Sequence, residues 1–202
     1  RDEKGFNILV EKAVLGEGRN LSASVSFAPD PANIELHLKV PSIETDFIET
    51  IWPKPAADKE TPLIYTWLVE KINNGTYKDV SASIILDGTL REDKPNLNTA
   101  YPWSYNWNFN EDKLKVEFGF KDIDVRYLDS LPQVEKSSGT GSLANDSMQL
   151  NIAAATLNKD IVLKEPAIFK FQDFMKVGAG HAETTLALKG PLSSVLSYLS
   201  NP

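Results

Sequence analysis

Most of this chain consists of segments in which apolar and polar residues alternate with a period of two. A β-strand sends such residues to opposite faces of a sheet, whereas a helix would scatter the apolar ones around its axis. The alternating segments are residues 21–27, 34–40, 80–86, 101–109, 114–120, 123–127, 148–154 and 182–188. We therefore expect a mainly β fold, built as a long antiparallel sheet with one apolar face.

Two segments have helical spacing instead. Thr61-Pro62 offers a capping hydroxyl and a proline at the first helical position, and Asn73-Asn74-Gly75 follows as a stop signal. The apolar residues between them share one helical face: Leu63, Ile64, Trp67, Leu68 and Ile72. This pattern predicts an amphipathic helix over residues 62–73. A short C-terminal helix is expected after Gly190-Pro191, where leucines and Val195 share a face.

The length of 202 residues suits one β-rich domain spanning residues 1–202. Because the chain begins at Arg1-Asp2 without a methionine, we expect it to be a fragment of a larger protein or a processed chain. The sequence contains neither a run of about 18 apolar residues nor a basic, apolar and small-residue signal pattern. We therefore expect any membrane anchor to lie outside this segment.

Charge and cysteine content exclude several classes of function. The chain has no cysteine, so disulfides, thiol catalysis and cysteine-ligated metals are excluded. The net charge is −7, and the 21 basic residues are dispersed along the sequence. A nucleic-acid-binding protein needs a concentrated basic face, and an anionic bilayer attracts clustered lysine and arginine. The sequence therefore predicts no nucleic-acid partner.

Few residues have the spacing of a catalytic or metal site. His37 and His181 are the only histidines, and each lies on the polar side of an alternating segment. The acidic pair Asp122 and Asp124 lies next to a predicted turn, where carboxylates are usually solvated. We therefore predict that the protein is not an enzyme and has no catalytic residues, no metal site and no cofactor.

One extended segment is rich in aromatic residues: Tyr101, Trp103, Tyr105, Trp107 and Phe109. A strand over this segment would place all of these rings on one face. Stacking sites for nucleic acids combine such rings with a basic groove, and here the interleaved residues are proline, serine and asparagine. Core packing and an apolar ligand surface remain as the two interpretations.

Three groups of residues together suggest a family. Trp52-Pro53 precedes the predicted helix, and Asn74-Gly75 and Tyr77-Lys78-Asp79-Val80 follow it; Val125–Pro132 leads to Gly139, and Leu188-Lys189-Gly190-Pro191-Leu192 precedes the last helix. Over about residues 20–200, this combination resembles the conserved central domain of large AsmA-like proteins of the YhdP type, which occur in Gram-negative bacteria.

This resemblance implies a segment of a long periplasmic protein that is tethered to the inner membrane by a helix outside this chain. The family looks like the bridge-type lipid transporters, in which repeated, strongly curved sheets form an extended β-groove with an apolar floor. It is associated with the transfer of phospholipid towards the outer membrane, and thus with outer membrane biogenesis. The implied partners are phospholipid or another acyl-chain lipid and neighbouring repeats of the same protein. The family has no catalytic residues to carry over.

The residues and the resemblance together favour a lipid-binding segment. Moving an acyl chain of ~16 carbons into water costs on the order of 10 kcal/mol, so a carrier must offer apolar surface along the whole route. The residues predicted to face the groove or a core are Val25, Phe27, Ile34, Leu36, Leu38, Ile84, Val116, Phe118, Phe120, Leu186 and Leu188. Trp67 and Leu68 are candidates for a cap over the groove.

A second interpretation fits the same period. If another sheet packs on the apolar face, the alternating residues form an ordinary core, and the domain is a periplasmic β-sandwich scaffold or interaction module without a lipid site. The two interpretations differ in what covers the apolar face.

Overall fold

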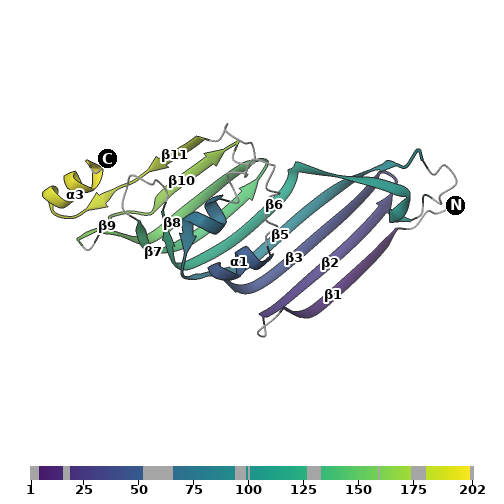
Figure 1. The fold of residues 1–202 in the computed structure, drawn as a ribbon, viewed down its shortest axis with the longest axis horizontal. Coiled ribbons are helices and arrows are strands. Elements are labelled where there is room, and N and C mark those ends of the chain that lie inside the picture. Colours follow the sequence, from purple (N-terminus) through teal and green to yellow (C-terminus); the bar gives the residue numbers. More distant parts are fainter. Residues whose placement is uncertain are drawn as a thin grey trace.

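The computed structural model describes residues 5–15, 19–51, 66–93, 99, 101–126, 133–158, 160–173 and 181–200. The described residues form one open antiparallel sheet of 12 strands, with few helices (Figure 1). The main path of the sheet runs β1-β2-β3-β5-β6-β7-β8-β10-β11. The strands are β1 (Phe6–Leu15), β2 (Arg19–Pro29), β3 (Ala32–Glu44), β4 (Ile72–Asn73), β5 (Thr76–Leu90), β6 (Tyr105–Val125), β7 (Val134–Ala144), β8 (Ser147–Asn158), β9 (Ile161–Leu163), β10 (Ala167–Gln172), β11 (His181–Thr185) and β12 (Leu188–Lys189).

The helices are short and lie outside the main path of the sheet. They are α1 (Thr45–Ile51), the π-helix η1 (Thr66–Lys71), the 3₁₀ turn η2 (Pro102–Ser104) and α3 (Leu192–Leu199). The mainly β fold, the long antiparallel sheet and the short C-terminal helix are thus confirmed. Neighbouring strands pair mostly through hairpins, as the alternating segments and turn residues predict.

Strand β1 is an element that the sequence pattern did not predict. It forms one edge of the sheet and pairs antiparallel with β2, with a register shift between Val10 and Ala13. Ile8, Leu9 and Val10 are consecutive apolar residues, and Leu9 lies on the face opposite the other two. Because β1 lies at the exposed edge of the sheet, apolar residues occur on both of its faces. The alternation of apolar and polar residues is therefore lost in this strand.

The predicted helix over residues 62–73 is wrong at its C-terminal end. Residues 62–65 lie outside the described residues, and the described part is the π-helix Thr66–Lys71. Ile72 and Asn73 then form β4 by pairing with Val125 and Asp124 of β6. Ile72 is buried in the core. Gly75, with φ of 71°, serves the turn from β4 to β5.

Two predicted strands have different limits. The aromatic segment 101–109 becomes a strand only at Tyr105, because Pro102 starts a 3₁₀ turn. The segment 182–188 is divided between β11 and β12, and Leu186 lies between them. Strand β12 leaves β11 and pairs with β9 instead, so Leu188 lies opposite Leu163.

Bulges in three adjacent strands produce the strong curvature of the sheet. Asp79 in β5, Asp122 in β6 and Lys136 in β7 all have positive φ, and the ladder register shifts beside each of them. A bulge adds one residue to one strand, which bends the strand and changes which positions face inward. In β6 the inward residues change from even numbers at Phe120 to odd numbers at Ile123. The apolar face therefore continues through the bend.

The Asp124 carboxylate stabilises the bend from the polar face. Its Oδ1 accepts a hydrogen bond from the backbone N–H of Lys136 at 2.8 Å, and its Oδ2 accepts one from Asn74 Nδ2 at 2.8 Å. The backbone N–H of Asp122 donates to Ser138 Oγ at 3.2 Å. The acidic pair Asp122 and Asp124 therefore has a structural role in the bend of the sheet.

An aromatic cluster closes one end of the apolar face. The Phe27 ring lies 5.5 Å from that of Phe6 and 6.0 Å from those of Tyr105 and Trp107. The Tyr105 hydroxyl lies 3.2 Å from the carbonyl oxygen of Pro29 and 3.0 Å from that of Thr99, and Trp107 Nε1 donates to the carbonyl of Pro102 at 3.1 Å. These bonds fasten the loop before β6 to the end of the sheet.

We expect Tyr105→Phe to lower the free energy of unfolding by about 1 kcal/mol, because it removes a buried hydroxyl that has carbonyl acceptors. Urea denaturation at constant m-value measures the loss. An unchanged midpoint would contradict a fastening role for this hydroxyl.

Candidate functional site

One row of apolar side chains crosses the sheet from its first strand to β10. The pairing registers place one residue of each strand in this row. In strand order, they are Val10, Ala23, Leu38, Ala82, Val116, Leu143, Met148 and Phe171. Rows on either side of it are also mostly apolar. The sheet therefore has one apolar face that is continuous across all of these strands.

The exposure of this row changes along its length. Val10 is 38% exposed and Leu38 is 36% exposed, whereas Leu143 and Met148 are only 7% and 5% exposed. We call the apolar face over β1, β2 and the part of β3 up to Leu38 the open half, and the apolar face over β6, β7, β8 and β10 the sealed half; Val40 and Ile43, further along β3, are buried in the core. The same face is thus partly accessible to solvent at one side and a packed core at the other.

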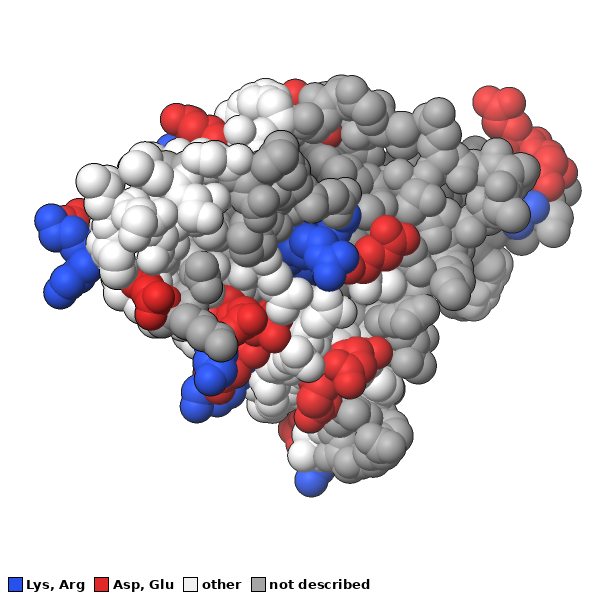
Figure 2. All heavy atoms as spheres, turned by 60° about the vertical axis from the view of Figure 1, so that its left-hand side comes forward, with Lys and Arg blue, Asp and Glu red and all other residues white. Residues whose placement is uncertain are grey.

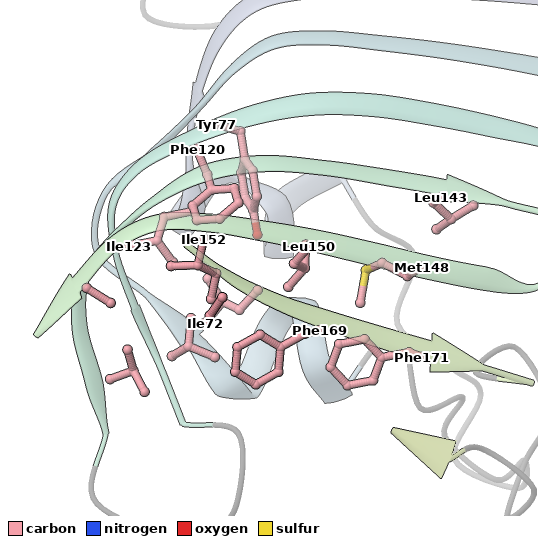
Figure 3. Packing of buried hydrophobic residues seen from close by; sticks show 14 of the residues in the cluster. Ile72, Tyr77, Phe120, Ile123, Leu143, Met148, Leu150, Ile152, Phe169 and Phe171 are labelled. Atoms are coloured by element: carbon pink, nitrogen blue, oxygen red, sulfur yellow. The ribbon is translucent and has the colours of Figure 1, made fainter. Parts of the chain in front are cut away.

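The sealed half is covered by the bend of the sheet and by short elements. Phe47 and Ile48 of α1, and Val195 and Tyr198 of α3, pack against its side chains. Figure 3 shows side chains from β5 and β6 facing those of β8 and β10 across the bend, among them Tyr77, Phe120, Ile152 and Phe169. Helix α1 follows β3 directly and contacts β3, β4 and η1 (Figure 1). The core therefore forms within one bent sheet, without a second sheet among the described residues.

A small cavity remains inside the sealed half. Its volume is about 30 Å³, and ten of its lining side chains are hydrocarbon, aromatic or thioether groups: Ile72, Phe118, Phe120, Ile123, Val125, Val134, Met148, Leu150, Ile152 and Phe169. The remaining two lining residues are Tyr77 and Ser137. Burial raises the pKa of the Tyr77 phenol well above its usual range, so this group remains protonated. The surface of the cavity is thus apolar, because the buried hydroxyl oxygens of Tyr77 and Ser137 are not exposed to it.

Two glycines make room for aromatic rings on the apolar face. A Cβ added to Gly141 would lie 2.2 Å from the Phe118 ring, and one added to Gly139 would lie 2.9 Å from the Phe120 ring. Both glycines lie on β7, directly opposite these phenylalanines on β6. The rings therefore cross over the neighbouring strand, and this packing fills the inside of the bend.

The predicted site residues divide between the two halves. Val25, Ile34, Leu36 and Leu38 lie on the apolar face in the open half, and Ile84 lies beside them on β5. Val116 and Phe118 are half-buried on β6, and Phe120 is buried. Phe27 faces the same side, but it is only 3% exposed within the aromatic cluster.

The remaining predicted residues lie elsewhere. Leu186 and Leu188 pack against the core at the β9 side of the sealed half, away from the open half. Leu186 lines a second cavity of about 10 Å³ together with Leu163, Ala167 and Phe169. Trp67 and Leu68, the predicted cap, lie in η1, and their side chains are outside the described residues.

The sequence pattern missed the contribution of β1 to the open half. Phe6, Ile8 and Val10 lie opposite Phe27, Val25 and Ala23 of β2, and Ile8 is 54% exposed. Phe6, Ile8 and Val10 occupy every second position, as in a strand with one apolar face, but the apolar Leu9 between the last two obscures this alternation. The open half is therefore wider than the sequence analysis indicated.

The opposite face of the sheet is polar. Ser24, His37, Ser83 and Lys115 lie in one cross-strand row on β2, β3, β5 and β6. His37 Nε2 lies 3.0 Å from Glu35 Oε1, and both side chains are exposed to solvent. His181 is exposed on the edge strand β11. Within the described residues, no group of three or more histidine, aspartate or glutamate side chains could hold a metal ion.

The described surface carries mixed charge. In the view of Figure 2, lysine and arginine side chains lie beside aspartate and glutamate, and the described residues seen there do not form one broad basic patch. None of the helices in the described ranges has the length and apolar character needed to cross a membrane.

Comparisons with protein-family models, with curated proteins and with solved structures gave no match. The resemblance to AsmA-like proteins is therefore a proposal, and the apolar face is the feature of the structure that bears on function.

Proposed function

We propose that this chain is a lipid-binding segment of an inner-membrane-anchored periplasmic protein of the AsmA-like type, which transfers phospholipid between the inner and outer membranes along an apolar β-groove. The observation that carries this proposal is the open half. There, an apolar face continuous with a packed core is left partly exposed.

The exposure of the open half is what a lipid carrier needs. Large apolar side chains in a soluble domain are normally covered, and a contiguous exposed set marks a site of interaction. Ile8 and Val10 of β1 and Leu38 of β3 lie on the same face on either side of β2, and all three are more than a third exposed. An acyl chain placed along them would replace water with hydrocarbon, which stabilises the chain by about 0.8 kcal/mol for each buried methylene.

The open edges of the sheet suit a repeated structure. Strands β1 and β11 are at the two ends of the main path, and each pairs along one side only among the described strands. Neighbouring repeats of the same protein could extend the sheet at these edges, so that the apolar face of one repeat continues into the next.

The sealed half favours the alternative function. Its side chains form an ordinary core, as expected for a periplasmic scaffold or interaction module. In that function, a protein surface would cover the open half in place of lipid.

Photo-crosslinking in cells tests the proposal. A photoreactive amino acid at Leu38, in the full-length protein, is expected to capture phospholipid, because this side chain lies on the exposed part of the apolar face. The matched control is the adjacent Lys39, which is exposed on the polar face. Capture of lipid at Leu38 and not at Lys39 supports a lipid route. Equal capture at both positions, or capture of protein alone at Leu38, favours the scaffold.

A further inference from the structure

We propose that strand β1 is a self-complementary edge, through which two copies of this chain form a dimer. In this dimer the two β1 strands pair antiparallel about a two-fold axis that passes between Glu11 and Lys12. The inference goes beyond the proposed function, because it concerns the partner of a sheet edge and not the lipid. It assigns β1 to a second copy and leaves β11 as the edge for a neighbouring repeat.

Strand β1 is an edge without the usual protection. It is 10 residues long, contains no proline, and has no partner strand on its outer side among the described residues (Figure 1). Soluble proteins usually make such edges short or place prolines and charges along them, because an exposed row of backbone N–H and C=O groups pairs with other strands. The charged residues of β1 are Glu11 and Lys12, which have opposite signs. The strand therefore offers a site for one more strand.

The apolar residues of β1 indicate that the missing cover is protein. Leu9 and Val14 are 65% and 62% exposed, and they lie on the polar face of the sheet, opposite Ser24 and Asn20 of β2. Ile8 is exposed on the other, apolar face. A lipid along the apolar face would cover Ile8 but neither Leu9 nor Val14. A strand added at the edge brings side chains to both faces and covers all three.

A bulge in the middle of β1 makes the strand match itself. Val10 and Ala13 both lie on the apolar face, and the two residues between them, Glu11 and Lys12, lie opposite the single residue Ser22 of β2. In a regular strand, two residues that are three positions apart would face opposite sides of the sheet. The extra residue of the bulge changes this, so that the order of faces is the same in both directions from the bulge.

This order of faces sets the register of the dimer. Directly opposite residues of paired strands face the same side of a sheet, so an antiparallel pairing about the bulge places Val10 opposite Ala13 of the second copy on the apolar face. It places Leu9 opposite Val14 of the second copy on the polar face, where both are exposed in the single chain. A shift of the register by one residue would break the match on both faces.

The charges of the bulge agree with this register. Glu11 lies opposite Lys12 of the second copy, and the two-fold axis repeats the pair, so the dimer contains two pairs of opposite charge. Both side chains are exposed in the single chain. Opposite charges directly across a ladder stabilise it, and like charges weaken it. The edge charges that would repel many other strands therefore favour a second copy of this one.

The two-fold pairing also closes the assembly. Each copy contributes the same strand, so no free β1 edge remains after two copies have paired. Because Val10 and Ala13 lie on the apolar face, the open halves of the two copies become one continuous apolar surface. The dimer therefore doubles the width of the open half.

Sedimentation equilibrium tests the dimer. An interface of one strand pair is small, so we expect the protein to change from mostly monomer to mostly dimer between about 1 and 100 μM. Glu11→Lys and Lys12→Glu each set like charges opposite one another twice, and each should raise the Kd at least about 10-fold. Lys115→Glu is the matched control, because it makes the same change of charge at an exposed position on β6, away from the edge. A monomer over the whole concentration range would overturn the inference.

Mixing the two edge variants tests the register. When Glu11→Lys chains and Lys12→Glu chains are combined, opposite charges again face each other at both crossings. The mixture should therefore form a heterodimer with about the Kd of the wild type, although each variant alone dimerises poorly. If the wild type dimerises and the mixture does not, the copies pair through another surface, and the inference is wrong.

Disulfide cross-linking provides a second readout. The chain has no cysteine, so introduced thiols report only the pair under test. A mixture of Leu9→Cys chains and Val14→Cys chains should cross-link between copies under mild oxidation, because these positions face each other. Either variant alone is the control, since its two thiols would lie about 15 Å apart along the paired strands, too far for a disulfide. Cross-linking of Leu9→Cys alone would contradict the register.

The outcomes separate this inference from the proposed function. If a neighbouring repeat occupied β1, the full-length protein would stay monomeric and no cross-link would form between copies. That result would overturn the dimer and leave the lipid route intact. Absence of phospholipid capture at Leu38 from a protein that dimerises as described would count against the proposed function alone.

Discussion

Alanine at Gly139 is expected to lower the free energy of unfolding by more than about 3 kcal/mol, because a Cβ at this position meets backbone atoms. That Cβ would lie 2.0 Å from the carbonyl oxygen of Asn151 on β8 and 2.9 Å from the Phe120 ring. The ladder between β7 and β8 would have to separate at the bend to make room. Urea denaturation of Gly139→Ala measures this cost.

Two other glycines of the same region serve as controls. A Cβ at Gly119 would have ordinary contacts, the nearest at 3.5 Å, so Gly119→Ala should change stability by less than about 1 kcal/mol. Gly141→Ala clashes only with the Phe118 ring, and a second substitution, Phe118→Leu, should restore part of the loss. Equal effects at Gly119 and Gly139 would contradict the close packing of the bend.

The period of two predicted an antiparallel sheet from strands that are apolar on one face, such as β2, β3 and β5, but it did not include β1, β7 or β10. Val25, Leu36 and Ile84 lie in register on that face as their spacing indicates. The sequence could not show which part of the face would be buried. Burial depends on the bend, and the bend depends on positive φ values at Asp79, Asp122 and Lys136. None of these residues is a glycine, whose presence would have indicated such a backbone conformation.

The end of the predicted helix was hidden for a related reason. The helix end at residue 73 was wrong because the pairing of Ile72 with Val125 is a long-range contact.

The difference between the two halves predicts effects of different size on stability for the same substitution. Ile123→Ala in the sealed half should cost about 2–5 kcal/mol of unfolding free energy, because the side chain is 2% exposed and its removal leaves a cavity. Ile8→Ala in the open half makes the same truncation at a side chain that is 54% exposed, so it should cost less than about 1 kcal/mol.

For phospholipid capture, in contrast to stability, we expect the open-half position Ile8 to have the larger effect. Ile8→Asp places a charge where an acyl chain would lie, and it should abolish phospholipid capture from a photoreactive residue at Leu38 while the domain stays folded. Ile8→Ala is the control for side-chain size. If Ile8→Asp unfolded the full-length protein as severely as Ile123→Ala does, the open half would be covered by protein in the native assembly. In that event the apolar surface of the open half would be part of an interface. A charge at Ile8, on the edge strand, would unfold the protein only if other protein surface packs against that side chain.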